Sequence, residues 1–496
     1  MGVTPPRPRV RTAHAILRGI AVVYAIAFVS LAVQMDGLYG SGGILPAAGY
    51  LEWLGSRLGE KAWSVHPTLF WFGASDAALA GACWAGAASA ALLFVGIVPT
   101  LSAAVCWALY FSLFQVGRVF LGFQWDILLL EAGFLAIFLA PLRLRQHVEY
   151  DPEPPRVVIW MLRWLLFRLM FASGVVKLLS DDPAWWNLTA LEYHYWTQPL
   201  PTWAGWFVHQ LPALFHRFCV LAMFVIELGA AWFIFGTRGM RLMAFFALVS
   251  LQVLIAATGN YTFFNLLTLV LCLSLLDDDA FHAVMAKVRP DRVRFALWPE
   301  EEVRWRRTRA AGLALSIAAA LPLAIAGGAL MVARFAGMAA LPRPVVTLVE
   351  TLEPWHLTSS YGLFSVMTTS RREIVLEGSM DGNEWREYEM RWKPGDVMRA
   401  PLFVAPHQPR LDWQMWFAAL GDWRRSPWLV EVERRLLDGS PAVLSLFAAD
   451  PFDGRPPRHV RAMLYDYEFT DLAEWQETGA WWKRRLIGPF SPPLSR

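Results

Sequence analysis

Long apolar runs recur through the first two thirds of the chain, and they restrict its fold more than any other feature. A helix of about 20 apolar residues is long enough to cross the hydrocarbon core of a bilayer. The runs cover residues 13–33, 76–96, 99–120, 124–140, 157–179, 213–236, 240–258, 261–276 and 310–334. The chain is 56% hydrophobic and only 17% charged, which excludes an ordinary soluble protein. We therefore predict a polytopic α-helical membrane bundle of about nine spans.

Basic residues gather in segments that all fall on one side of such a bundle. These segments are residues 11–18, 143–156, 238–241 and 287–309. Because cytoplasmic loops carry an excess of Lys and Arg, we predict a cytoplasmic N-terminus and a basic cytoplasmic loop at 277–309. Two Trp-rich loops, 34–66 and 180–212, then lie on the other side. The bilayer is the expected partner, and a net charge of only +3 argues against nucleic acid.

The chain after the last apolar run has a different pattern. Apolar residues at 374–376 and the alternation over 460–470 predict strands, and the spacing over 427–437 predicts a helix. We therefore divide the chain into a transmembrane domain at 1–340 and an extracytoplasmic β-rich domain at 341–496.

Turn residues between the predicted strands favour hairpins. Asp381-Gly382 and Pro394-Gly395 offer the positive φ angles that tight turns need. The Ser-x-Asp-Gly-x-x-Trp pattern at 379–385 resembles a hairpin of discoidin-type jelly rolls. This short resemblance favours a β-sandwich or jelly roll for the domain.

A set of motifs in the C-terminal region resembles the lipase maturation factor family. The motifs are Tyr361-Gly-Leu-Phe364, Glu377-Gly-Ser379, Asp381-Gly382, Trp385, Ala405-Pro-His407, Arg410-Leu-Asp-Trp-Gln-Met-Trp-Phe417, Pro427-Trp428 and Trp481-Trp-Lys-Arg484. The resemblance implies a membrane chaperone or maturation factor, rather than an enzyme, that assists a secreted lipase-type client. It further implies that the client matures in the lumen of the endoplasmic reticulum, or in the periplasm of a bacterium, where the client need not be a lipase.

Residues within 410–428 are candidates for contact with such a client. The candidates are Arg410, Trp413, Gln414, Trp416 and Trp428. Alternation over 412–417 predicts a strand in which Trp413 faces away from Gln414 and Trp416. With Trp on both faces, two alternatives stay open, namely core packing and a docking surface for a partner.

Charged residues inside the predicted spans form a second candidate site. The acids are Asp76, Asp126, Glu131 and Glu227, and the bases are Arg118, Arg163, Arg168 and Lys177. Because a lone charge in hydrocarbon is costly, we expect these groups to pair inside the bundle. Asp126, Glu131, Arg163, Arg168 and Glu227 are the candidates for a functional cluster. The alternatives are structural ion pairs and the buried site of a membrane enzyme or transporter.

Several common catalytic patterns are absent from the sequence. The four cysteines lie in apolar runs, and no CxxC or Cys/His spacing suggests zinc. Neither a Gly-x-Ser-x-Gly elbow nor a phosphate-binding Gly-rich loop occurs. We therefore expect no metal and no cofactor.

Overall fold

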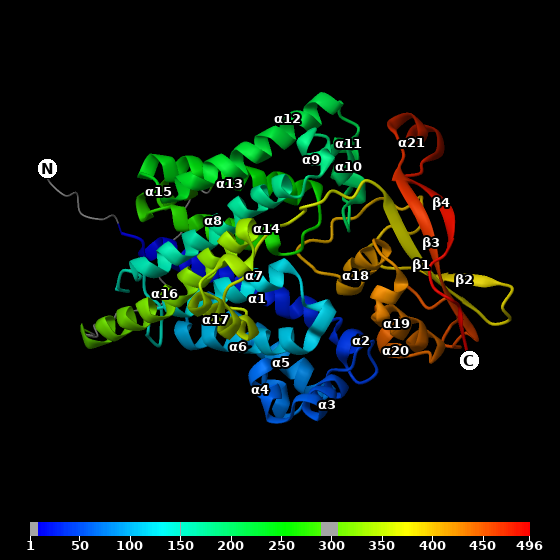
Figure 1. Ribbon diagram of the computed structural model, residues 1–496, viewed down its shortest axis with the longest axis horizontal. Coiled ribbons are helices and arrows are strands. Elements are labelled where there is room, and N and C mark those ends of the chain that lie inside the picture. Colours follow the sequence, from blue (N-terminus) through cyan, green and yellow to red (C-terminus); the bar gives the residue numbers. More distant parts are fainter. Residues whose placement is uncertain (1–7, 149, 289–305) are drawn as a thin grey trace.

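A computed structural model describes residues 8–148, 150–288 and 306–496 of the protein. Long helices fill one end of the molecule, and an antiparallel sheet lies at the other end (Figure 1). Most of the predicted basic loop, residues 289–305, lies outside the described residues.

Seven helices in the described part of the chain are long and apolar enough to cross a membrane. They are α1 (Val10–Ala32), α5 (Asp76–Val95), α6 (Pro99–Gly117) with η3 (Arg118–Phe120), α8 (Arg156–Leu179), α12 (Ala213–Phe224) with η4 (Val225–Gly229) and η5 (Ala230–Phe235), α13 (Arg238–Thr258) and α16 (Arg306–Ala336). The prediction of a multi-span helical bundle is thus confirmed.

The predicted count of about nine spans is not confirmed, because two of the predicted spans form shorter helices. These are α7 (Gln124–Leu139) and α14 (Phe264–Cys272), the latter continued by η6 (Leu273–Leu275). At a rise of about 1.5 Å per residue, α7 is about 24 Å long, which is less than the roughly 30 Å of a bilayer core. Pro141 lies two residues after Leu139, the last residue of α7, and cannot continue the hydrogen-bond ladder of the helix.

Short helices cover the ends of the long ones. In the first predicted external loop they are α2 (Met35–Tyr39), α3 (Ala47–Leu58), η1 (Gly59–Lys61) and α4 (Ala62–Val65), and η2 (Leu69–Phe72) follows this loop. In the second they are α9 (Pro183–Trp186), α10 (Ala190–Thr197) and α11 (Trp203–His209). Others are α15 (Asp278–Val288), η7 (Met338–Ala340), α17 (Arg343–Leu352) and η8 (Glu353–Trp355).

The C-terminal region contains a single five-stranded antiparallel sheet in its described residues. Its strands are β1 (Arg371–Ser379), β2 (Trp385–Tyr388), β3 (His459–Phe469), β4 (Trp482–Pro489) and β5 (Leu494–Ser495). The order is β2-β1-β3-β4, and β5 pairs with β3. The predicted strands are therefore present, but the predicted jelly roll is not confirmed. Gly382 has a φ of +80° in the β1–β2 hairpin, whereas Gly395 has no positive φ.

Helices lie between this sheet and the membrane bundle (Figure 1). They are α18 (Arg410–Ala419) and α19 (Pro427–Leu437). The short η9 (Trp423–Arg425) precedes α19, and α20 (Pro441–Leu444) follows it. The last helix, α21 (Leu472–Thr478), joins β3 to β4. The prediction of a helix over 427–437 agrees with α19. The prediction of a strand over 412–417 is wrong, since α18 covers it. The side chains of α18 are buried on nearly every side, so its polar residues do not form the single solvent-facing stripe that reveals helical periodicity.

Candidate functional site

Arg410, the first residue of α18, reaches out of the sheet domain into the membrane bundle. Its Nη1 and Nη2 donate to Oδ2 and Oδ1 of Asp126 on α7, at 3.0 and 2.9 Å. Its guanidinium also donates to the carbonyl oxygen of Phe120 and to the hydroxyl of Tyr110. Neither member of the Arg410–Asp126 pair is exposed to solvent. A two-pronged, charge-assisted contact therefore joins residues 284 positions apart.

The environment of Arg410 favours its charged form. Burial by itself would lower the pKa of the guanidinium, but the Asp126 carboxylate outweighs this effect and raises the pKa above its ordinary value. Because an unpaired buried charge is far more costly than a paired one, removing either partner leaves the other with a large desolvation penalty. The pair therefore requires that the sheet domain stays docked.

A second charged pair lies further along α7. Arg168 of α8 forms an ion pair with Glu131, and the Tyr361 hydroxyl donates to the other oxygen of Glu131 at 2.9 Å. Arg168 also donates to Thr358 Oγ1 at 3.2 Å and to the Ser359 carbonyl at 2.9 Å. Residues 358–361 lead from the last long helix to the sheet. The tyrosine of the Tyr-Gly-Leu-Phe motif thus completes an ion pair of the bundle.

The other charged candidates make separate contacts. Glu227, in a π-helical turn after α12, accepts a hydrogen bond from Lys177 at 2.7 Å. Arg163 donates to the carbonyl oxygen of Ser274 at 2.9 and 2.7 Å. Of the five charged candidates, only Glu131 and Arg168 bond to each other in the described structure. The predicted pairing between charged residues of the spans is therefore observed for Glu131 and Glu227, as distinct pairs rather than one cluster. Asp126 pairs instead with Arg410 from outside the predicted spans, and Asp76 accepts hydrogen bonds from Ser41.

Polar side chains of the bundle hold the chain just before α18. The Asn260 amide oxygen accepts from the backbone N–H of Val404 at 2.7 Å, and its nitrogen donates to the Leu402 carbonyl at 2.7 Å. Gln34 accepts from the backbone N–H of Arg410 at 2.9 Å. The sequence motif around Ala405-Pro-His therefore lies at the interface between the two domains.

Sequence reasoning missed Gln34 and Asn260 as contacts to this motif. The available signal was a polar side chain at the mouth of a predicted span. His407 lies in the same stretch, where Ser30 Oγ contacts its Nδ1 at 2.9 Å. Burial, followed by the charge of Arg410, lowers the pKa of His407 to about 4. His407 is therefore neutral at ordinary pH.

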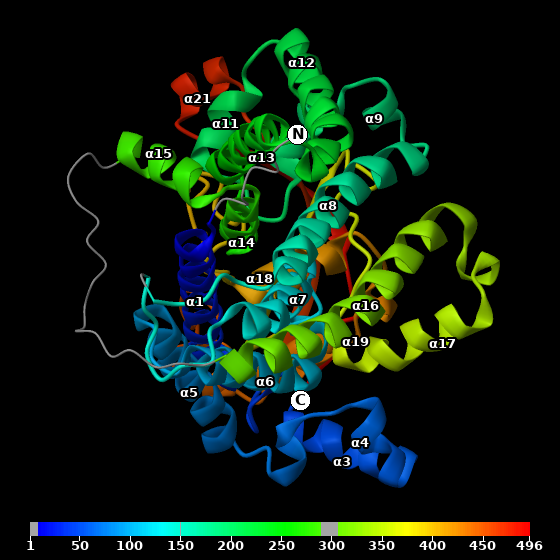
Figure 2. The ribbon, with the colours of Figure 1, turned by 90° about the vertical axis from the view of Figure 1, so that its left-hand side faces the viewer.

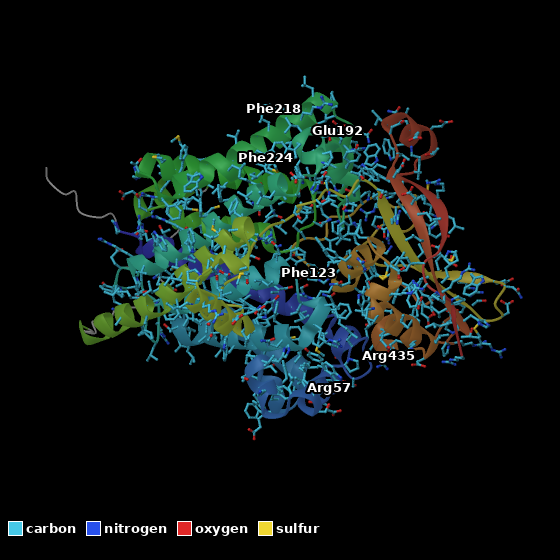
Figure 3. All side chains as sticks on the ribbon, in the orientation of Figure 1. Arg57, Phe123, Glu192, Phe218, Phe224 and Arg435 are labelled. Carbon is cyan, nitrogen blue, oxygen red and sulfur yellow. The ribbon has the colours of Figure 1, made fainter. Side chains whose placement is uncertain are left out.

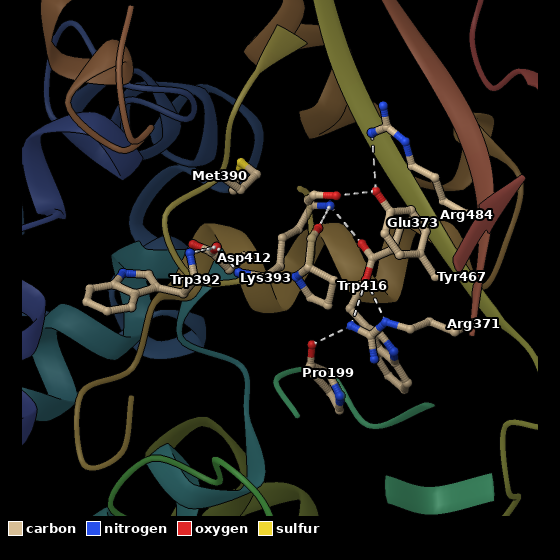
Figure 4. Close-up of polar contacts among 12 residues, drawn as sticks. Pro199, Arg371, Glu373, Met390, Trp392, Lys393, Asp412, Trp416, Tyr467 and Arg484 are labelled. Carbon is tan, nitrogen blue, oxygen red and sulfur yellow. Dashed lines mark hydrogen bonds and ion pairs between the residues drawn. The ribbon is translucent and has the colours of Figure 1, made fainter. Parts of the chain in front are cut away.

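A further charged cluster anchors β1 to the loop between α10 and α11 (Figure 4). Arg371 donates to Glu373 at 2.8 Å and to the Pro199 carbonyl at 2.9 Å. Lys393 donates to the second oxygen of Glu373 at 2.7 Å. Asp412 of α18 accepts from the backbone N–H of Lys393 at 2.9 Å. Burial raises the pKa of Asp412 to about 6, although these backbone hydrogen bonds oppose the shift.

The tryptophans predicted for partner contact are buried against the bundle. Trp413 packs edge-on against Trp125, with ring centroids 4.6 Å apart, and Trp428 packs against Phe120 at 6.0 Å. Trp416 donates through Nε1 to the Thr197 carbonyl at 2.8 Å. Phe123, labelled in Figure 3 between the bundle and the sheet domain, also contacts Trp413, with ring centroids 5.9 Å apart.

The remaining partner candidate, Gln414, donates to the carbonyl oxygen of Val119 at the end of α6. The two alternatives for these tryptophans were core packing and a docking surface, and in the structure they pack in the core. The motif Arg410-Leu-Asp-Trp-Gln-Met-Trp-Phe417 forms an interface within the chain, which we call the domain interface. Among the described residues, no three His, Cys, Asp or Glu side chains lie together as metal ligands.

Comparison with known proteins covers both domains. A family model described as the lipase maturation factor transmembrane domain matches residues 11–283, and one described as the lipase maturation factor C-terminal domain matches residues 357–492. Lipase maturation factor 2 of Gallus gallus is 40% identical over all of this chain and 82% of its own length. The Homo sapiens lipase maturation factor 2 is 38% identical over 97% of this chain and 82% of its own length. Lipase maturation factor 1 of Bos taurus is 35% identical over 97% of this chain and 88% of its own length. No solved structure matches the chain.

Proposed function

Because this multi-pass chain belongs to the lipase maturation factor family, we propose that it assists a secreted client protein to fold or assemble at the membrane. The client is a lipase-type enzyme, as the names of the relatives suggest. The observation that carries this proposal is the similarity over both domains, whose matched ranges contain the residues of the domain interface. A sheet domain that is locked to a membrane bundle suits the presentation of a fixed surface to clients that emerge at the membrane.

Clustered basic residues support an orientation with the N-terminus in the cytoplasm. Arg9, Arg156, Arg238 and Arg241 line one pocket at the end of the bundle opposite the sheet domain. They belong to segments far apart in the sequence, yet they occupy the same end. By the positive-inside bias that end is cytoplasmic, and the sheet domain is extracytoplasmic. The equivalent compartment is the lumen of the endoplasmic reticulum in a eukaryote and the periplasm in a bacterium.

The path of the chain supports nine crossings of the bundle in spite of two short helices. Arg118, after α6, stacks on Tyr50 of the first external loop, with its Cζ 4.7 Å from the ring centroid, whereas α8 begins at Arg156 in the basic pocket. The intervening α7 must therefore return the chain to the basic end. In the same way α14 and η6 lead from Asn260, at the domain interface, to Asp277, which pairs with Arg238 in that pocket.

An exposed aromatic patch is the surface that we assign to client contact. We define the aromatic patch as Trp203, Phe207, Phe403 and Trp481. Trp203 packs against Phe403 with ring centroids 5.4 Å apart, and Phe207 packs against Trp481 at 6.2 Å. The side chains of Trp203, Phe207 and Phe403 are each nearly half exposed. Exposed aromatic groups of this kind are common anchors of protein contacts.

Lipase secretion tests the proposed function. In host cells that lack the chain, we expect the activity per amount of secreted lipase to fall, and the wild-type chain to restore it. The activity of an unrelated secreted enzyme serves as the control and stays unchanged. Equal lipase activity with and without the chain would contradict the proposal.

Substitutions in the aromatic patch test the assigned surface separately. Phe207→Ser and Phe403→Ser are expected to lower lipase activity while the chain accumulates normally. Phe72→Ser is the matched control, because Phe72 is 83% exposed in the other external loop. Equal activity of all three variants would instead identify the patch as part of the aromatic belt at the membrane surface.

A further inference from the structure

The end of the bundle opposite the sheet domain contains a basic pocket of about 380 Å³. Figure 2 looks onto this end of the molecule. Arg9, Glu153, Pro154, Arg156, Ile159, Arg238, Arg241 and Asp277 line the pocket. Its volume lies within the range of roughly 300–1,000 Å³ that is usual for small-molecule sites.

Three long helices begin at this pocket. They are α1, whose first residue follows Arg9, and α8 and α13, which start at the lining residues Arg156 and Arg238. The first N–H groups of a helix have no partner within the helix, and the helix dipole places positive charge there. At α1 the backbone N–H groups of Arg11 and Thr12 already donate to Asp278, so the N-termini of α8 and α13 are the ones that favour an anion in the pocket.

Not all of the arginine charge in the pocket is balanced. Arg238 pairs with Asp277 at 2.8 Å, and Arg241 donates to the carbonyl oxygens of Leu275 and Gly236. In contrast, Nε of Arg9 is buried and has no hydrogen-bond partner among the residues that the structure describes.

Arg156 is likewise available to a ligand. Its side chain is exposed, and it has no ion-pair or hydrogen-bond partner among the described residues. The carboxylate of Glu153 accepts from the backbone N–H of Arg9, at 3.2 Å to its nearer oxygen. With four arginines against two acids, the lining carries an excess of positive charge.

An apolar groove of about 770 Å³ adjoins the basic pocket and shares Glu153, Pro154 and Arg156 with it. Its apolar lining includes Ile137, Phe138, Leu142, Val157, Leu313 and Ile317, from α7, the loop after it, α8 and α16. The polar side chains in the groove are largely paired, since His14 contacts Asp151 at 2.8 Å and Arg143 contacts the same carboxylate. A ligand that fits both spaces carries an anionic head and a hydrocarbon chain.

We propose that the basic pocket binds the phosphate group of an anionic phospholipid, and that an acyl chain of this lipid lies in the apolar groove. The pocket lies at the level where the membrane-spanning helices begin, so a lipid headgroup reaches it from the membrane surface. Basic pockets between membrane helices are known to hold anionic headgroups. A free phosphate ester shares the head chemistry but leaves the groove empty.

Lipid binding to the purified full-length chain in detergent tests this proposal. The probes are dioleoyl phosphatidylglycerol, dioleoyl phosphatidylcholine and glycerol phosphate, and native mass spectrometry counts the bound molecules. We expect the chain to prefer phosphatidylglycerol to the other two. Arg156→Gln is expected to weaken its binding about fivefold, and Arg9→Gln with Arg156→Gln about 25-fold, at about 1 kcal/mol for each arginine.

Two controls keep these results interpretable. Arg57→Gln removes the same charge from an exposed position on α3 and is expected to leave binding unchanged. Arg156→Lys keeps the charge and is expected to retain most of the binding. This control remains informative if the double variant does not fold. Equal phosphatidylglycerol binding by the wild type and the Arg156→Gln variant would overturn the site. Glycerol phosphate that binds as tightly as the lipid would overturn the assignment of the groove.

Discussion

At the scale of single residues, Arg410 makes the buried ion pair that joins α18 to the bundle. Its guanidinium makes hydrogen bonds to Asp126, Phe120 and Tyr110 in the bundle. Intramembrane charge pairing could be predicted from the cost of a lone charge, but this particular partner could not. The sequence places Arg410 284 residues from Asp126, and any base inside a predicted span was an equally good partner on energetic grounds.

Loss of Arg410 is expected to destabilise the chain strongly. Arg410→Met leaves Asp126 buried without a counter-charge, which costs about 3–5 kcal/mol of unfolding free energy. Thermal unfolding of the chain in detergent measures the change. Arg424→Met is the matched control, because the side chains of Arg424 and its partner Asp422 are both mostly exposed and such pairs contribute about 0–1 kcal/mol. Arg410→Met with Asp126→Leu removes both charges and should recover much of the stability. Equal melting of Arg410→Met and the control would contradict the role of this pair.

Substitutions in the Glu131–Arg168 pair distinguish a structural role of the pair from a catalytic or transport role. If the pair holds helices together, Glu131→Gln and Arg168→Gln singly reduce the amount of folded chain, and the double variant restores it. Lipase activity per amount of chain then stays near the wild-type value in the double variant. In the Glu131→Gln variant the glutamine carbonyl oxygen can still accept from the Tyr361 hydroxyl, so the contact between Tyr361 and α7 survives. Normal abundance with lost activity in either single variant would point to a functional site instead.

At the scale of elements, the apolar spans and the strands could be predicted because their patterns follow from local burial. A helix that faces lipid must be apolar for about 20 residues, and β3 alternates because its faces differ. α18 could not be predicted in this way. Both bundle and sheet bury it, and its polar residues Arg410, Asp412 and Gln414 alternate with apolar ones, which is the pattern of a strand.

Helix α19 contains a titratable group whose burial makes stability depend on pH. Glu433 accepts from Ser491 at 2.7 Å, and its other oxygen is buried with no partner in the described part of the chain. Burial raises the pKa of Glu433 to about 7, against the weaker opposing effect of Ser491, compared with about 4.3 in an unfolded chain. The folded state therefore binds the proton more tightly. The resulting stability is present in full below about pH 4 and is lost as the pH rises through 7.

Replacement of Glu433 should remove this pH dependence of the stability. We expect Glu433→Gln to match the wild type near pH 4 and to exceed its unfolding free energy by about 3–4 kcal/mol at pH 8. Melting of the chain at a series of pH values gives the comparison. Glu431→Gln is the control, since Glu431 lies on the exposed side of the same helix and pairs with Arg434 in solvent. A wild-type chain that melts with the same pH profile as Glu433→Gln would argue against a buried, protonated carboxyl.

At the scale of the whole molecule, two short helices decide the topology. A bundle of only seven crossings would leave α7 and the α14–η6 stretch on one side of the membrane. The two connections before and after α7 lie at opposite ends, however, because Arg118 contacts Tyr50 while Arg156 lines the basic pocket. A helix of about 24 Å can cross when neighbouring helices cover its polar ends or the bilayer thins locally. The ion pairs of Asp126 and Glu131 fall on this short helix, where protein rather than lipid surrounds them.

Thiol labelling distinguishes nine crossings from seven. Replacing Cys83, Cys106, Cys219 and Cys272 with serine or alanine leaves a background for single cysteines. A cysteine at Leu144, which is 78% exposed in the loop after α7, is expected to resist an impermeant reagent applied from the extracytoplasmic side. Cysteines at Arg57, in the first external loop, and at Arg424, beyond the domain interface, should react under the same conditions. If α7 did not cross, Leu144 would share the side of Arg57, and both positions would react together. The cytoplasmic assignment of the basic pocket would then fail as well, because Leu144 and Arg156 belong to the same connection.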